Sequence, residues 1–185
     1  MSRQAYPELL IWNASSGTAF NTFTTAKTVL PPQCVYPFLA TWWHKDRIVR
    51  ITATGNLSNI VTTPGTITFQ MMLGATIVMN SGAFQMSSTA HTNVPFKAEC
   101  LVRCDVEGAT AQLVGGWTVS SQALSLTAVA DSTTTIATLA GPSPMALGTA
   151  FDATVAQNLD MFVGFSISGA GNQIQVFNYI VESLN

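Results

Sequence analysis

The feature that most constrains the fold is an alternation of apolar and polar residues in two separate parts of the chain. In 96–106 the apolar side chains occupy every second position. The same period of two runs through 155–168 and again through 173–184, on either side of Gly-Ala-Gly-Asn at 169–172. A period of two places one face of a β-strand on a core. We therefore expect a hairpin over 95–121 and a closing hairpin over 155–184, with the two hairpins contributing central strands to facing sheets.

Shorter strand patterns separated by turn signals account for most of the remaining chain. Residues that favour turns occur together at 55–56, 80–82 and 108–109. No helical period of 3.6 persists for more than a turn or two. Several short strands at regular spacing predict an all-β domain of two antiparallel sheets. With about eight strands, a jelly-roll β-sandwich over residues 31–185 is the favoured architecture.

The first thirty residues differ from this pattern. The run 14–28 is dominated by Ala, Ser, Thr, Gly, Asn and Phe, and Lys27 is its one charged residue. Phe20 and Phe23 are unexpected in a free loop, because exposed aromatic side chains in a polar segment often mark a docking site. Two interpretations of residues 1–30 follow. The segment is either an extended N-terminal arm that lies across another subunit, or an edge segment packed on its own domain.

The composition favours a protein that works in an assembly. Hydrophobic residues make up 48% of the chain and charged residues only 9%, whereas about 25% is usual for a soluble domain. Ser and Thr number 39, so the predicted surface is polar but weakly charged. Such a surface gives a lone monomer little colloidal protection, and interface cores are depleted in charge. We therefore expect an obligate oligomer or a component of a larger assembly.

Charge and hydropathy exclude several classes of partner. The net charge is −2, and Lys45, Arg47 and Arg50 form the densest group of basic residues. This is too small a positive footprint for nucleic-acid binding or for an anionic membrane surface. No window approaches 18 apolar residues, which argues against a transmembrane helix. Residues 1–8 lack the apolar core of a signal peptide, so we expect assembly in a cytoplasm.

The residue patterns of catalytic, cofactor and metal sites are missing. His44 and His91 stand in unrelated contexts and form no zinc-binding pattern. Cys100 and Cys104 would lie about 13 Å apart along one strand, too far for a disulfide. With Cys34, they are expected to be buried, reduced thiols. We therefore predict that the chain is not an enzyme and has no cofactor.

Parts of the chain resemble small jelly-roll virion proteins of tailed bacteriophages, over roughly residues 66–185. The stretches that carry this resemblance are Asn80-Ser81-Gly82-Ala83-Phe84, Ala90-His91-Thr92, Val94-Pro95-Phe96, Gly148-Thr149-Ala150-Phe151-Asp152, Val155-Ala156-Gln157-Asn158-Leu159-Asp160 and Val176–Asn185. The resemblance implies a head decoration or cement protein that binds the major capsid protein on the capsid surface and stabilises the shell. It also implies a homo-oligomer, with a trimer as the expected state, and N-terminal arms that reach neighbouring subunits. It implies no catalytic residues.

Aromatic side chains are the expected anchors of such an interface. The candidate contact residues are Trp12, Phe20, Phe23, Trp42 and Trp43. Of the adjacent pair Trp42 and Trp43, one is expected in the core and the other at the surface, on opposite faces. The alternative function is a receptor- or carbohydrate-binding jelly-roll module of a tail fibre. That module would use loops 88–94 and 141–152, which carry His91, Asn93 and Asp152.

Overall fold

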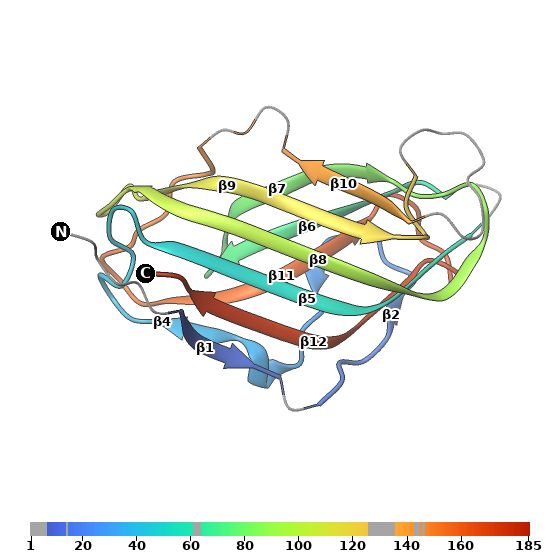
Figure 1. Ribbon diagram of the computed structural model, residues 1–185, viewed down its shortest axis with the longest axis horizontal. Helices are drawn as coiled ribbons and strands as arrows, with labels where there is room; N and C mark the ends of the chain where they lie inside the picture. The colour runs from blue at the N-terminus through green and yellow to red at the C-terminus, as the bar shows by residue number, and fades with distance from the viewer. Residues whose placement is uncertain (1–6, 14, 61–63, 126–135, 143–144, 146) are drawn as a thin grey trace.

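The chain folds into two antiparallel β-sheets that pack face to face (Figure 1). The computed structural model describes residues 7–13, 15–60, 64–125, 136–142, 145 and 147–185. Their regular elements are β-strands and one short 3₁₀ turn, Pro32–Cys34. In this part of the chain, no helix has the length and apolarity needed to cross a membrane. The predicted all-β sandwich is confirmed.

The larger sheet has the strand order β1-β12-β5-β8-β9-β10, and β2 also pairs with β12. Its strands are β1 (Glu8–Trp12), β2 (Phe20–Asn21), β5 (Ile48–Asn59), β8 (His91–Val106), β9 (Gln112–Ser121), β10 (Ala137–Gly141) and β12 (Gln173–Ser183). The smaller sheet has the order β3-β11-β6-β7, and β4 also pairs with β11. Its strands are β3 (Lys27–Thr28), β4 (Tyr36–Phe38), β6 (Thr66–Leu73), β7 (Thr76–Gln85) and β11 (Gln157–Phe165).

The core lies between the two sheets and is lined by the apolar half of each alternating strand. Trp117 of the larger sheet packs against Phe69 of the smaller one, with 5.8 Å between the ring centroids. Tyr179 of the larger sheet and Met71 of the smaller one are fully buried as well. The three cysteines are buried and free, as predicted. Burial raises the pKa of the Cys104 thiol to about 11, so this thiol stays protonated and packs as a small apolar group.

The hairpin predicted over 95–121 is confirmed, and the closing hairpin is wrong. Strands β8 and β9 pair from Phe96 opposite Ser121 to Val106 opposite Gln112. In contrast, β11 belongs to the smaller sheet and β12 to the larger one, so the connection at 166–172 crosses from one sheet to the other. Both strands alternate because they line the same core from opposite sides. Alternation reports a buried face and does not identify a hydrogen-bonding partner.

A buried asparagine holds this crossing in place. The Asn172 side chain accepts a hydrogen bond from the Ile60 backbone N–H (3.1 Å) and donates one to the Ile167 carbonyl oxygen (3.1 Å). Its backbone N–H donates to the Gly169 carbonyl oxygen at 3.0 Å. One side chain thus satisfies two backbone polar groups at the crossing, where a hairpin would have used a strand ladder.

The turns predicted at 55–56 and 80–82 are also wrong, because both lie inside strands. Gly55 stands in the middle of β5, where a Cβ atom would lie 1.9 Å from the Gln175 carbonyl oxygen. A glycine is therefore required there by the close approach of two backbones. Gly82 has a φ of +74° and lies in a bulge of β7, the other common reason for glycine in a strand. The turn predicted at 108–109 does connect β8 to β9.

The described part of residues 1–30 packs on its own domain. Strands β1 and β2 pair with β12, and β3 pairs with β11. Phe23 is buried against Phe165 in an edge-to-face contact of 5.2 Å between ring centroids. Val29 and Leu30 are buried as well. These residues form an edge segment rather than a free arm, and 1–6 and 14 lie outside the described residues.

Candidate protein-binding face

The structure separates the five aromatic residues that were predicted to form an interface. Phe23 and Trp43 are buried in the core, so neither side chain is available as an interface anchor on the surface of the domain. Phe20 and Trp42 are half-buried against the core. Trp12 is 52% exposed, and it alone of the five presents most of a large apolar surface to solvent.

The two adjacent tryptophans lie together and not on opposite faces. Their rings meet edge to face at 5.0 Å, and both contact Phe38. The segment between β4 and β5 is irregular, so the alternation of a strand does not apply to it. Trp43 lies in the core, as was expected of one of the pair, whereas Trp42 is half-buried and packs against the same core.

Cations cover the half-buried rings. The Arg47 guanidinium lies 4.2 Å from the centroid of the Trp42 ring, and the Arg47 Nε–H donates to His44 Nε2 at 3.0 Å. The Lys27 ammonium lies 4.8 Å from the centroid of the Phe20 ring. Cation–π contacts of this kind occupy the ring faces that an interface partner would otherwise use. Trp42 and Phe20 are therefore poor candidates for interface anchors.

Trp12 lies on the outer face of the larger sheet. It pairs with Ile180 of β12, and Leu9 pairs with Glu182. Side chains of directly paired residues point to the same face of an antiparallel sheet. The pairing therefore places Leu9, which is 56% exposed, on this face with Trp12 and Ile180.

A hollow in the same face is lined mostly by apolar side chains. It has a volume of about 530 Å³ and lies over β8 and β9. Leu101 borders it and is 45% exposed. Gly116 contributes bare backbone to its floor, because a Cβ atom there would lie 2.8 Å from the Gly141 carbonyl oxygen. The backbone of the neighbouring strand β10 at Gly141 thus leaves no room for a side chain at Gly116 that would fill the hollow.

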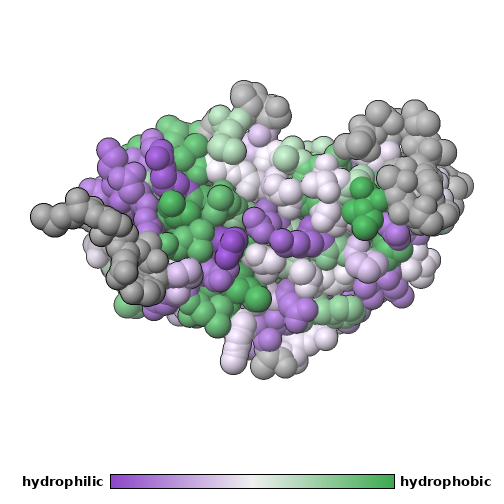
Figure 2. All heavy atoms as spheres, in the orientation of Figure 1, coloured by the Kyte–Doolittle hydropathy of each residue, from purple (hydrophilic) through white to green (hydrophobic). Residues whose placement is uncertain are grey.

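We call the exposed or half-buried apolar residues of this surface the apolar face. Its members are Leu9, Trp12, Ile48, Leu101, Val114, Pro142, Met145 and Ile180. Figure 2 shows this side of the molecule, with hydrophobic surface gathered over the left half of the larger sheet and hydrophilic side chains between the hydrophobic areas. Strand pairing places Glu182 and Arg50 between Leu9 and Leu101, so the apolar residues form two groups with an ion pair between them. Exposed apolar side chains gathered in this way beside polar groups mark a candidate protein-binding site.

The polar side chains of this surface form internal ion pairs. Arg50 contacts Glu182 at 2.9 Å across two strands, and Lys97 contacts Glu99 at 3.1 Å along β8. The charge and hydrogen bond of Glu182 raise the pKa of the Arg50 guanidinium further above its ordinary value. Because each of these cations has a carboxylate beside it, the electrostatic potential of the surface is close to neutral.

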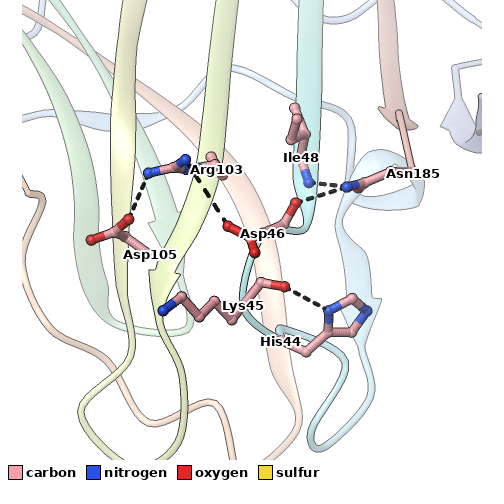
Figure 3. Close-up of polar contacts among 7 residues, drawn as sticks. All are labelled: His44, Lys45, Asp46, Ile48, Arg103, Asp105 and Asn185. Atoms are coloured by element: carbon pink, nitrogen blue, oxygen red, sulfur yellow. Dashed lines mark hydrogen bonds and ion pairs between the residues drawn. The ribbon is translucent and has the colours of Figure 1, made fainter. Parts of the chain in front are cut away.

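One end of the apolar face is held by a network around Asn185 (Figure 3). The Asn185 side chain accepts a hydrogen bond from the Ile48 N–H (2.8 Å) and donates one to the Asp46 carbonyl oxygen (2.7 Å). Arg103 lies 2.6 Å from Asp105 and 4.0 Å from the Asp46 carboxylate. The network fixes the first residue of β5, so Ile48 and Arg103 are presented on rigid strands.

The loop residues of the alternative binding module are not brought together. His91 is buried at the start of β8, and the Asn93 N–H donates to Ser58 Oγ at 2.8 Å. Asp152 follows Phe151, whose N–H bonds to Ala111 beyond the other end of β8, and a strand of this length spans about 50 Å. In the part of the chain that the structure describes, no group of three or more His, Cys, Asp or Glu residues could hold a metal ion.

Of the apolar face, only Trp12 was among the residues predicted from the sequence to form an interface. Leu101 was missed, although it interrupts the polar side of an otherwise regular strand and so left a signal. Leu9 and Val114 join it only through strand pairing, and Met145 joins it only because the fold places this residue beside the hollow. In comparisons with known proteins, no model of a protein family, no curated protein and no solved structure matches the chain.

Proposed function

We propose that this chain is a structural protein that assembles with other protein subunits through the outer face of its larger sheet. The observation that supports the proposal is the apolar face, where Leu9, Trp12 and Leu101 are each about half exposed on rigid strands. Large apolar side chains that gather exposed on one face mark protein-interaction sites. The ion pair of Arg50 and Glu182 lies between Leu9 and Leu101, so an interface here would cover paired charges together with apolar groups.

Within this class, the proposed role is that of a phage head decoration or cement protein. The resemblance of residues 66–185 to such virion proteins and the low charged fraction of 9% support this role. The mechanism would be mechanical. Rigid β-sandwiches joined to one another through this face, with about 800 Å² buried per partner in a standard interface, would hold the capsid subunits to which they are attached together against the outward pressure of packaged DNA. The proposed location is the capsid surface, with the major capsid protein and sister subunits as partners.

Binding to heads that lack the chain would test this proposal. Purified particles of the phage that encodes the chain should contain it in a fixed ratio to the capsid protein, as measured by mass spectrometry. The purified wild-type chain should co-sediment with heads prepared without it, and Leu101→Glu should not. The control is Leu39→Glu, because Leu39 is 72% exposed and lies after β4, outside the apolar face. Absence from the particles, or equal binding by the Leu101 and Leu39 variants, would refute the proposal.

A further inference from the structure

We infer that a second copy of this chain occupies the apolar face, related to the first by a two-fold axis that passes near Leu101. The inference rests on the proposed role of this face in subunit assembly and specifies the partner. Three properties of the face lead to it: its balanced charges, its size and its position in the sheet.

The charges of the face match those of an identical surface. Three cations and three carboxylates alternate across it, namely Arg50, Lys97, Arg103, Glu99, Asp105 and Glu182. A strongly charged partner would find no complementary field there. A second copy turned by a two-fold axis presents the same alternating set in the reverse order. With the axis across β8 at Leu101, Lys97 of one copy approaches Asp105 of the other, Glu99 approaches Arg103, and no net repulsion arises.

The size of the face meets the requirement of a stable pair. Neighbouring strands are about 4.8 Å apart, so the larger sheet is about 24 Å wide from β1 to β10. The run from Pro95 to Asp105 along β8 is about 33 Å long at 3.3 Å per residue. The product is about 800 Å² and is an upper limit, because β1 and β10 have only five residues each. It is comparable with the area of about 800 Å² that each partner contributes to a standard interface.

The position of Leu101 favours a two-fold axis over a three-fold one. A cyclic trimer needs two different complementary surfaces on each subunit, whereas a single surface closes with itself only through a two-fold axis. Leu101 pairs with Arg50 of β5 on one side and with Gly116 of β9 on the other, so it stands near the middle of the strand order. Opposed about an axis at this point, each Leu101 would lie beside its counterpart and fill the hollow next to Gly116.

Light scattering of the full chain tests the identity of the partner. The wild-type chain and Leu39→Glu should both be dimers at micromolar concentration. Leu101→Glu should be a monomer with a dimer dissociation constant at least about 30-fold higher. The new carboxylate would stand opposite Arg50 within the same subunit, so folding should be retained, and urea unfolding of the variant provides the check.

Mixing two variants tests the position of the axis. Leu101→Glu and Leu101→Lys should each be monomeric alone, and an equimolar mixture should form dimers, because opposite charges meet across the axis. A monomeric wild-type chain would overturn the inference, and so would a trimer or a mixture that stays monomeric. Head binding that is lost in Leu101→Glu while the wild-type chain is monomeric would leave the proposed function in place and remove only the second copy.

Discussion

Replacing Gly55 by alanine would test the pairing of β5 with β12, on which the whole outer face depends. A Cβ atom at this position would lie 1.9 Å from the Gln175 carbonyl oxygen and 3.0 Å from Cε1 of Phe96. Cβ atoms essentially never come within 3.0 Å of a heavy atom that is not bonded nearby. The two strands would therefore have to separate by roughly 1 Å in a close-packed sandwich.

The cost of this separation can be worked out from the structure. Gly55 pairs with Val176, and Asn56 pairs with Gln175, so about two ladder hydrogen bonds would be stretched, each worth about 1 kcal/mol. Overpacking in a well-packed interior adds about 1–3 kcal/mol. We expect the free energy of unfolding to fall by about 3–5 kcal/mol, which corresponds to a decrease in Tm of about 6–20 °C for a domain of this size.

Urea unfolding followed by tryptophan fluorescence would measure this loss, and Gly82→Ala is the matched control. Gly82 has a φ of +74°, but no heavy atom lies within 4 Å of the position of its missing Cβ. The control therefore carries only the cost of a left-handed backbone conformation, about 1–2 kcal/mol. If Gly55→Ala costs no more than Gly82→Ala, then residue 55 does not lie between two closely approaching strands and the described pairing is wrong.

Three further substitutions test individual polar groups. The Tyr179 hydroxyl is fully buried, with no hydrogen-bond partner among the described residues, so Tyr179→Phe should stabilise the fold by about 1 kcal/mol in urea unfolding; a loss of stability would reveal a partner. Burial raises the pKa of Asp160 despite the hydrogen bond from Thr28. Ionised Asp160 therefore destabilises the folded state. This loss of stability is absent below the unfolded-state pKa and complete above the raised folded-state pKa, so Asp160→Asn should stabilise the fold more at pH 7 than at pH 3. An equal effect at both pH values would contradict this cause. Asn172→Ala should cost about 2–3 kcal/mol, because the buried Ile60 N–H and its neighbouring carbonyl lose their partner; a neutral result would mean that the sheet crossing is held by other contacts.

Local geometry explains what could be predicted from the sequence alone. The period of two in β8, from Phe96 to Cys104, identifies a strand with one buried face whatever lies beside it. The burial of the three cysteines and the turn at 108–109 follow from the same local rules. These rules were sufficient for the all-β class and for the β8–β9 hairpin, because a short turn brings the second strand directly to the first.

Tertiary structure decided the features that depend on partners distant in the chain. Strands β11 and β12 alternate like a hairpin but lie in opposite sheets, and no local pattern distinguishes these outcomes. The sequence Gly55-Asn56 is typical of a turn, but in the structure Gly55 is the point where the backbones of β5 and β12 approach closely enough to exclude a Cβ atom. The apolar face is the clearest case, since register alone brings Trp12 of β1 to the outer surface that Leu101 of β8 also occupies. Register is set by packing over the whole sheet, and the binding surface therefore exists only in the folded chain.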